Sequence, residues 1–416
     1  MGISEFREVK NNFIPKTSFS KLKDYTNHTT PVNVYIDGSF YTYTGFISQN
    51  LSSDGTYYIP NLVAQTVCNS IESSISKIRK LKFEIDNIYV FFDGVKSYSK
   101  QQTILKRRQK KQTCANMNKI VNTIIRNFND LGYIINNLAI GEAEHEMFIY
   151  RNTSNPSIFL TDDSDMFHIS YGYNSRTFND YAFLGTKSLN FTCDLYKLKE
   201  CNFKNMPKLV FTTLCGLKGC DYTYDTFTKS MYITAIKEFI NPSNHDCLLI
   251  VEELKNFCKR FKKFEFLTIS NIHSHLKPII YNSLTEEKDY VTISGIYTIN
   301  DVCFVIKLLL KLLICSSYKF QWNKTQHTFC KDDGILAQIQ TLTWTVNYSL
   351  IGCRYNKYFE NISYPQKLDI FTFYATLLSF KNDIVFDKSP RSVVSRKQFM
   401  DIFVKNVSTK QKTKNV

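Results

Sequence analysis

Apolar runs that stop at an aspartate alternate with amphipathic stretches in the first part of the chain. The run Val32 to Ile36 is closed by Asp37-Gly38, and the run Ile88 to Phe92 is closed by Asp93-Gly94. Residues 61–83, between these runs, follow helical periodicity, because Val63, Val67, Ile71, Ile75 and Ile78 fall roughly on one face. Strand, helix and strand in this order predict a right-handed parallel crossover.

The same alternation continues along the chain. A helix is expected over 118–131, then a strand at 133–135, a short helix opening near 142 and a strand over 157–162. The longest apolar run, Val302 to Cys315, is interrupted by Lys307 and Lys311 and is too short to span a bilayer, so it predicts a core helix and no membrane partner. The pattern predicts an α/β core with a central, mostly parallel sheet over 1–240 and a mainly helical lobe over 241–416.

Carboxylates gather where the expected strands end. Glu142 and Glu144 open a helix, and Asp163 and Asp165 follow the strand at 157–162. Open parallel sheets bind their ligands at the carboxyl ends of the strands. Carboxylates this dense repel one another unless a multivalent cation neutralises them, and oxygen ligands without zinc-spaced Cys or His favour Mg²⁺ or Mn²⁺. A solvated acidic loop is the alternative, and the other strand-end aspartates make it the weaker interpretation.

The overall charge is opposite to that of this cluster. The chain has 52 Lys and Arg against 37 Asp and Glu, a net charge of +15, which favours a polyanionic partner such as nucleic acid. A basic run from Lys106 to Lys111 follows Asp93; such a run is usually a solvated face, and its position favours nucleic acid. The 12 cysteines include no CxxC pair, and the N-terminus does not resemble a signal peptide. An intracellular protein, cytoplasmic or nuclear and not secreted, is expected; protein partners are not indicated.

Five motifs in order resemble the metal-ligand series of the 5′-nuclease superfamily, which includes flap endonucleases and Xrn-type 5′→3′ exoribonucleases. They are Asp-Gly at 37, Val-Phe-Phe-Asp-Gly ending at 94, Glu-Ala-Glu at 142–144, Asp-x-Asp at 163–165 and Gly-Cys-Asp-Tyr at 219–222. The resemblance implies a PIN-like core and two Mg²⁺ or Mn²⁺ ions. By itself Asp221 would be interpreted as a helix-end cap. The implied metal ligands are Asp37, Asp93, Glu142, Glu144, Asp163, Asp165 and Asp221, with Asp37 and Glu142 acting partly through water.

Finer features favour the Xrn branch. His145 follows the Glu-Ala-Glu motif as in Xrn proteins, and residues 335–372 resemble the second conserved Xrn region, which flap endonucleases lack. After Asp221 the chain also lacks the Gly-x-Gly turn with which flap endonucleases grip duplex DNA. The resemblance implies a 5′→3′ exoribonuclease acting on single-stranded, 5′-monophosphorylated RNA, with RNA favoured over DNA. The implied catalytic and 5′-phosphate-binding cations are Lys100, Arg107 and Arg108, with Lys100 at the scissile phosphate, and the implied base-stacking residues are Tyr43, Trp344 and Tyr358.

The chain departs from the Xrn pattern at several positions. Ile104 replaces a glutamine that helps to hold the 5′ phosphate, and Tyr43 replaces a stacking histidine. The chain is much shorter than cellular Xrn proteins, which indicates a reduced, diverged member, and a viral source is one interpretation. Two alternatives stay open: a flap-endonuclease-like DNA nuclease of replication or repair, and an inactive nucleic-acid-binding protein on the same fold.

Overall fold

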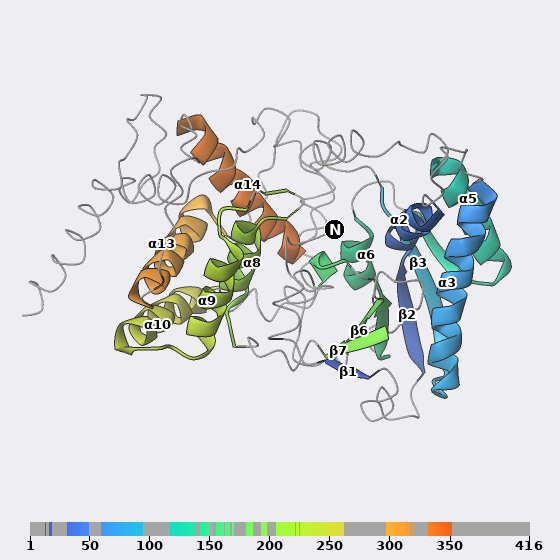
Figure 1. Cartoon of the computed structure of the whole chain (residues 1–416), viewed down its shortest axis with the longest axis horizontal. Coiled ribbons are helices and arrows are strands. Elements are labelled where there is room, and N and C mark those ends of the chain that lie inside the picture. Colours follow the sequence, from blue (N-terminus) through green and yellow to red (C-terminus); the bar gives the residue numbers. More distant parts are fainter. Residues whose placement is uncertain are drawn as a thin grey trace, which may run out of the picture. The chain divides into compact units, whose positions relative to one another are not determined.

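A computed structural model gives the fold, and its chain divides into two compact units (Figure 1). The first unit comprises residues 1–205, 263–293 and 348–360, and the second comprises 206–262, 294–347 and 361–416. We describe each unit on its own. The structure describes residues 13, 16–18, 31–49, 60–94, 117–137, 142–149, 151, 155–161, 163–166, 169, 180–185, 193–197, 205–220, 222–223, 225–261, 297–316, 318 and 332–351.

The first unit is built on a seven-stranded sheet in the order β1-β7-β6-β5-β2-β3-β4. Strands β6, β5, β2, β3 and β4 run parallel, and β7 and β1 add antiparallel pairs at one edge, so the mostly parallel sheet expected from the sequence is confirmed. The strands are β1 Lys16–Ser18, β2 Val32–Asp37, β3 Ile85–Phe92, β4 Ile134–Asn137, β5 Ser157–Leu160, β6 Asp180–Gly185 and β7 Cys193–Lys197.

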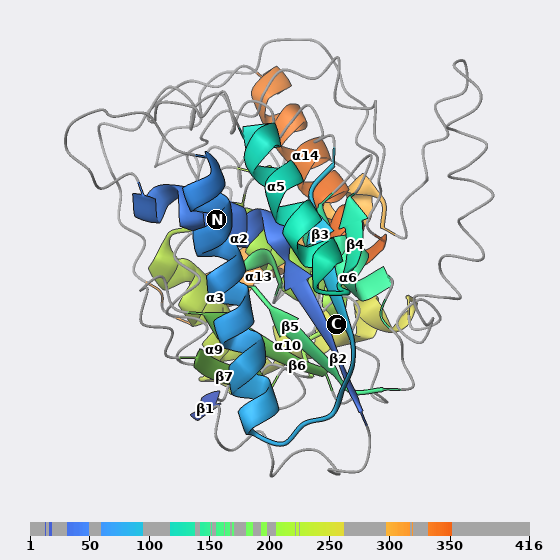
Figure 2. The same cartoon turned by 90° about the vertical axis from the view of Figure 1, so that its right-hand side faces the viewer.

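Three helices cover one face of this sheet: α2 (Gly38–Gln49), α3 (Pro60–Lys80) and α5 (Met117–Asp130). In Figure 2, α3 and α5 lie in front of β2 and β3. Alternate strand residues such as Val34, Ile36 and Val90 are fully buried against these helices. The apolar stripe predicted for α3 is confirmed, because its five members Val63, Val67, Ile71, Ile75 and Ile78 are all buried.

The opposite face carries a layer of aromatic rings under the short helix α6 (Ala143–Ile149). The ring of Tyr35 stacks on Tyr89 at 5.0 Å and on Phe159 at 5.3 Å between centroids. Met147 and Phe148 of α6 pack on the same cluster. Since side chains on one face of a strand recur every second residue, the next positions along β2 and beyond β3 on this face are Asp37 and Asp93. The aromatic layer and the two carboxylates therefore lie next to one another on the same face of the sheet.

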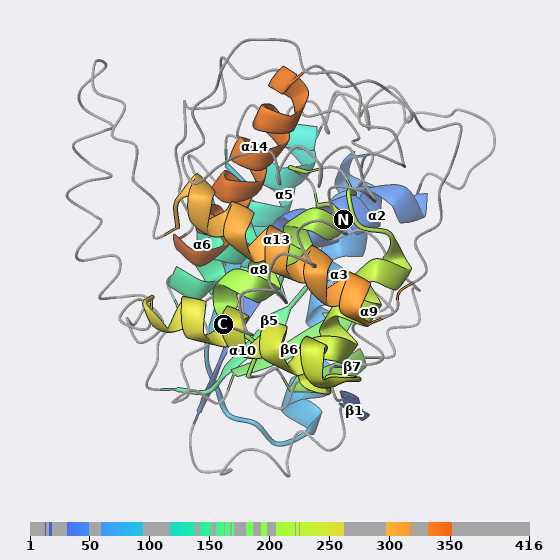
Figure 3. The same cartoon turned by 90° about the vertical axis from the view of Figure 1, so that its left-hand side faces the viewer.

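The described part of the second unit is helical, as expected for the C-terminal lobe (Figure 3). The predicted core helix at Val302–Cys315 is confirmed as part of α13, most of whose apolar residues are buried and which packs on α8, α9 and α10. Among the described residues, no helix is long and apolar enough to cross a membrane. The helices are α8 Lys208–Lys218, α9 Lys229–Ile240, α10 His245–Lys259, α13 Ile299–Cys315 and α14 Asp332–Ile351, the last turn of α14 from Tyr348 belonging to the first unit.

The two compact units are discontinuous in sequence, and the domain boundary at residue 240 stays a prediction. The first continuous segment of the sheet unit ends at Asn205, and residues 206–240 are grouped with the helices. The physical reason is packing: α8 and α9 both lie against α13, which comes much later in the chain. A boundary set by tertiary contacts cannot be read from local sequence patterns.

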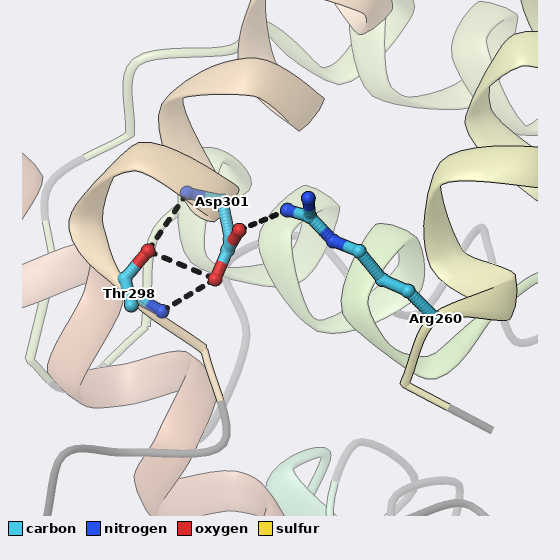
Figure 4. Close-up of polar contacts among 3 residues, drawn as sticks. All are labelled: Arg260, Thr298 and Asp301. Atoms are coloured by element: carbon cyan, nitrogen blue, oxygen red, sulfur yellow. Dashed lines mark hydrogen bonds and ion pairs between the residues drawn. The ribbon is translucent and has the colours of Figure 1, made fainter. Parts of the chain in front are cut away.

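One polar cluster joins α10 to the start of α13 (Figure 4). Thr298 and Asp301 form a capping box, in which Thr298 N donates to Asp301 Oδ2 at 2.8 Å and Asp301 N donates to Thr298 Oγ1 at 3.2 Å. Arg260, just after α10, forms an ion pair with the same Asp301 and lies over the ring of Phe257, 3.8 Å from its centroid. The first turn of α13 is thus held from within and from the neighbouring helix.

Candidate functional site

Asp37 lies at the junction of β2 and α2 and is 2% exposed. Its Oδ1 accepts a hydrogen bond from Phe40 N at 2.8 Å, which caps the first turn of α2. Its Oδ2 accepts from Thr161 Oγ1 at 3.0 Å, beyond the end of β5. A Cβ on the next residue, Gly38, would lie 2.7 Å from the Phe92 ring, so glycine is required for β2 and β3 to approach this closely.

Asp93 lies beside Asp37, beyond the end of β3. Its backbone N–H donates to Ser39 Oγ at 2.7 Å, and its Oδ1 accepts from Ala143 N at 2.9 Å. The carboxylate therefore faces the N-terminus of α6, where a negative charge is stabilised by the exposed amide groups. These two hydrogen bonds, both between residues far apart in the chain, fix this aspartate between α2 and α6.

Asp163 and Asp165 follow β5, as the sequence predicts. Thr161 Oγ1, which donates to Asp37, also accepts from Asp163 N at 3.2 Å. Asp163 Oδ1 in turn accepts from Asp165 N at 3.2 Å, and Asp165 is 8% exposed. Thr161 thus links the end of β5 to Asp37 on the neighbouring strand.

Asp37 is perturbed electrostatically by its neighbours. The pKa of Asp37 is raised from 3.8 to about 7, first by burial and then by the negative charges of Asp93 and Asp163. The hydrogen bonds from Phe40 and Thr161 act in the opposite direction. The structure therefore brings together the carboxylates that end three adjacent parallel strands, and their repulsion is the kind that a bound cation relieves.

Two further predicted ligands lie at the start of α6. Glu142 is 5% exposed and Glu144 is 8% exposed. Glu142 Oε2 accepts a hydrogen bond from the hydroxyl of Tyr348 at 3.0 Å, and the Tyr348 ring meets His145 edge-on with 4.2 Å between centroids. All of these residues belong to the first unit.

The sequence patterns did not predict four members of this neighbourhood. Glu146, one helical turn after Glu142, is 1% exposed, and its spacing of four residues on a short helix was the available signal. Tyr348 carried no such signal as a partner of Glu142, because 206 positions separate the two residues. The Ser39 and Thr161 hydroxyls, which orient Asp93 and Asp37, were likewise not anticipated.

The donor chemistry of the site fits a hard divalent cation. The described donors are mainly carboxylate oxygens, which Mg²⁺ and Mn²⁺ prefer, and the pKa of Asp37 is raised by burial and by the nearby charges of Asp93 and Asp163. Within the described residues, no three Asp, Glu, His or Cys side chains already form a ready-made ligand group.

The structure describes two of the remaining predicted residues, Tyr43 and Trp344. Tyr43 is half-buried on α2, one turn after Ser39. Trp344 is 8% exposed in the second unit, and its ring meets Tyr222 edge-on at 4.9 Å, the arrangement of a packed core residue, so stacking on a base would require this contact to open. Four of the predicted cation and metal positions, and one stacking position, lie outside the described residues: Lys100, Arg107, Arg108, Asp221 and Tyr358.

Comparison with known proteins finds only solved structures of low sequence identity and low TM-score. No family model and no curated protein sequence matches the chain. Among solved structures, the catalytic core of Rad2 in complex with DNA substrate is 14% identical, with 97% of this chain and 99% of that chain covered and a TM-score of 0.44. Human GEN1 in complex with Holliday junction DNA is 13% identical over 78% and 82%, with a TM-score of 0.38. The T5 D15 protein co-crystallised with metal ions is 12% identical over 68% and 99%, with a TM-score of 0.33. The chain's own sheet order and carboxylate geometry therefore carry the functional argument.

Proposed function

We propose that this protein is a divalent-cation-dependent nuclease, and more specifically a 5′→3′ exonuclease that hydrolyses single-stranded, 5′-monophosphorylated RNA. One observation carries the proposal: Asp37, Asp93 and Asp163 end three adjacent parallel strands, and burial together with the charges of Asp93 and Asp163 raises the pKa of Asp37 to about 7. A structural role alone gives no reason to collect negative charges in a buried corner.

The residues of this chain would have the following roles in phosphodiester hydrolysis. Bound Mg²⁺ or Mn²⁺ ions would stabilise the attacking and the leaving oxygens of a phosphodiester. Asp93, Glu144, Asp163 and Asp165 would hold the cations, together with Asp221 outside the described residues. Asp37 and Glu142 would act partly through water. Thr161 and Ser39 orient Asp37 and Asp93 through the hydrogen bonds described above.

The choice of the exoribonuclease branch rests on the motif resemblance and on one contact. Tyr348 belongs to the segment that resembles the second conserved Xrn region, and it hydrogen-bonds to Glu142 in the carboxylate neighbourhood. Flap endonucleases lack that segment. A flap-endonuclease-like DNA nuclease is the second candidate, because the five acidic motifs alone would suit it. An inactive nucleic-acid-binding protein is the third, and loss of a carboxylate would favour it, but the whole motif series is retained.

The deciding experiment compares three end-labelled substrates. Purified protein is incubated with 5′-monophosphorylated single-stranded RNA, the same sequence as DNA, and a DNA duplex with a 5′ flap, each with Mg²⁺ and with EDTA. The proposal expects mononucleotides released from the 5′ end of the RNA in Mg²⁺ and none in EDTA. Cleavage confined to the flap junction would favour the DNA nuclease, and tight binding without cleavage would favour the inactive protein.

Neutralising the cluster tests the role of the carboxylates. Asp165→Asn or Glu144→Gln should reduce hydrolysis by orders of magnitude and leave RNA binding intact, because the basic residues are unchanged. Asp86→Asn is the matched control: Asp86 is exposed at the start of β3, at the opposite end of the same sheet, where it accepts a hydrogen bond from Asn155. Undiminished cleavage by purified Asp165→Asn protein would overturn the assignment.

The 5′ end provides a separate test. Arg107 and Arg108 follow Lys100 by seven and eight residues, a sequence spacing that in a helix would correspond to one face and that would suit a terminal phosphate; all three lie outside the described residues. RNA with a 5′-monophosphate should therefore be degraded faster than RNA with a 5′-hydroxyl or a cap. Equal rates on 5′-phosphate and 5′-hydroxyl RNA would indicate that Ile104 marks a lost phosphate pocket, and would shift the proposal toward an endonuclease.

A further inference from the structure

The geometry around Glu142 assigns a role to a residue from the far end of the chain: we infer that Tyr348 is a positioning residue, whose hydroxyl holds the Glu142 carboxylate in the orientation that serves the divalent cation. This inference rests on the proposed nuclease function. It adds to that function a residue that is neither acidic nor basic and that contacts the cation only through Glu142.

The first step is the hydrogen bond itself. The Tyr348 hydroxyl donates to Glu142 Oε2 at 3.0 Å, and the two residues are 6% and 5% exposed. Bonds from a neutral donor to a charged acceptor are stronger than bonds between neutral groups, and burial removes the water that would otherwise compete. A phenol has one proton and no charge. It can therefore direct the carboxylate without neutralising it, whereas a lysine or arginine at this place would compete with a cation.

The second step is that the tyrosine ring is itself held. Its edge meets the His145 ring with 4.2 Å between centroids and an interplanar angle of 68°. His145 is 2% exposed and lies on α6, three residues after Glu142. Glu142 and His145 therefore contact two parts of one tyrosine, its hydroxyl and its ring. This arrangement fixes the direction from which the hydroxyl approaches the carboxylate.

The third step concerns the freedom of Glu142. A glutamate has a longer, more flexible side chain than an aspartate, and at the start of a short helix its backbone alone leaves several rotamers open. The carboxylates of Asp37 and Asp93 each accept a hydrogen bond from a backbone N–H group, that of Phe40 and that of Ala143. For Glu142 the Tyr348 hydroxyl supplies the corresponding restraint, and such outer-shell partners typically change metal affinity about 10- to 100-fold when they are removed.

The test removes only the oxygen atom. Tyr348→Phe keeps the ring against His145 and deletes the donor to Glu142. The matched control is Tyr133→Phe, which deletes another tyrosine–glutamate hydrogen bond, to Glu72, on the face of the sheet covered by α3 and α5. Mn²⁺ binding is followed by the loss of the free-ion electron paramagnetic resonance signal, and RNA hydrolysis is followed against Mg²⁺ concentration.

The inference predicts about 10-fold weaker Mn²⁺ binding for Tyr348→Phe, equivalent to about 1.4 kcal/mol, and no change for Tyr133→Phe. The Mg²⁺ concentration for half-maximal hydrolysis should rise by a similar factor, while the rate at saturating Mg²⁺ stays within a few fold. In a Glu142→Gln background, Tyr348→Phe should have no additional effect on Mn²⁺ binding, because the group that it positions is altered.

The outcomes separate this inference from the proposed function. If the wild-type protein binds Mn²⁺ and Tyr348→Phe binds it equally well, Tyr348 is a structural residue and only the inference fails, whatever happens to the melting temperature. If Tyr348→Phe weakens binding equally with and without Glu142→Gln, the effect does not pass through Glu142 and the inference again fails. If the wild-type protein binds no Mn²⁺ and hydrolyses no substrate, the proposed function fails, and the inference fails with it.

Discussion

Replacing Asp37 with asparagine should stabilise the metal-free protein. Asp37 is 2% exposed, and its pKa is raised from 3.8 to about 7 by burial and by the charges of Asp93 and Asp163. Between these two values the folded state keeps a proton that the unfolded state has released, so stability falls as the pH rises through this window. Above pH 7 the whole penalty is present, and asparagine, which has no charge, removes it.

The magnitude follows from the change in pKa. A rise from 3.8 to about 7 corresponds to at most about 4 kcal/mol at pH 8. Asp37→Asn weakens the bond from Phe40 N and removes the acceptor of the Thr161 hydroxyl, since an amide has one uncharged oxygen, and together these changes cost about 1–2 kcal/mol. A net gain of about 2–3 kcal/mol is therefore expected at pH 8, and a gain of less than about 1 kcal/mol at pH 5, where most Asp37 side chains in the folded protein are already protonated.

The assay must report on the sheet unit. Both tryptophans, Trp322 and Trp344, belong to the second unit, so intrinsic fluorescence would follow the wrong part of the chain. Amide hydrogen exchange of peptides covering β2, in EDTA at pH 5 and pH 8 and corrected for intrinsic rates, gives the opening free energy of the relevant strand. Peptides from α13 provide an internal reference, and Asp86→Asn provides the control substitution.

A gain at pH 8 that does not exceed the gain at pH 5 would refute the reasoning, since the penalty must grow with pH. Divalent cations offer a second check on the same variant. Mg²⁺ at pH 8 should increase protection of β2 in the wild-type protein, by an amount that grows with the ratio of Mg²⁺ concentration to its Kd, and should protect Asp37→Asn less.

Three further predictions concern other parts of the chain. Asp301→Ala should destabilise the second unit by about 1–2 kcal/mol and Arg260→Gln by about 1 kcal/mol or less, because only Asp301→Ala removes the capping box as well as the ion pair. Tryptophan fluorescence in denaturant would measure both losses, and a larger loss for Arg260→Gln would contradict the argument. Gly219→Ala should lower the free energy of unfolding of the second unit by about 1–3 kcal/mol, because Gly219 has φ 93° and a Cβ there would lie 2.7 Å from Asp225 N. The same fluorescence assay would measure this loss, and an unchanged denaturation midpoint would contradict the prediction. Tyr43→Ala should shorten the run of nucleotides removed per encounter, since stacking contributes about 1–3 kcal/mol per base; a sharp fall in Tm with intact processivity would identify Tyr43 as a core residue.

Local pattern in the sequence was sufficient for the framework of the sheet unit. The apolar runs that stop at Asp37 and Asp93 became β2 and β3, and the stripe from Val63 to Ile78 became the buried face of α3. These elements were predictable because hydrophobic periodicity and the residues that end a strand or helix act over a few positions and do not depend on the rest of the fold. The rule that parallel strands share their carboxyl ends was then enough to group Asp37, Asp93 and Asp163 at one edge of the sheet.

Tertiary structure decided what depends on residues far apart in the chain. Strands β1, β6 and β7 complete the sheet without having been anticipated, because strand pairing is a long-range choice among many partners. The raised pKa of Asp37 and the burial of Glu146 follow from three-dimensional packing. The Tyr348–Glu142 hydrogen bond is the clearest case, since no local pattern links side chains 206 positions apart. The sequence determined which groups could perform chemistry, and only the fold decided which of them meet, because burial and charge interaction are set by distance in space.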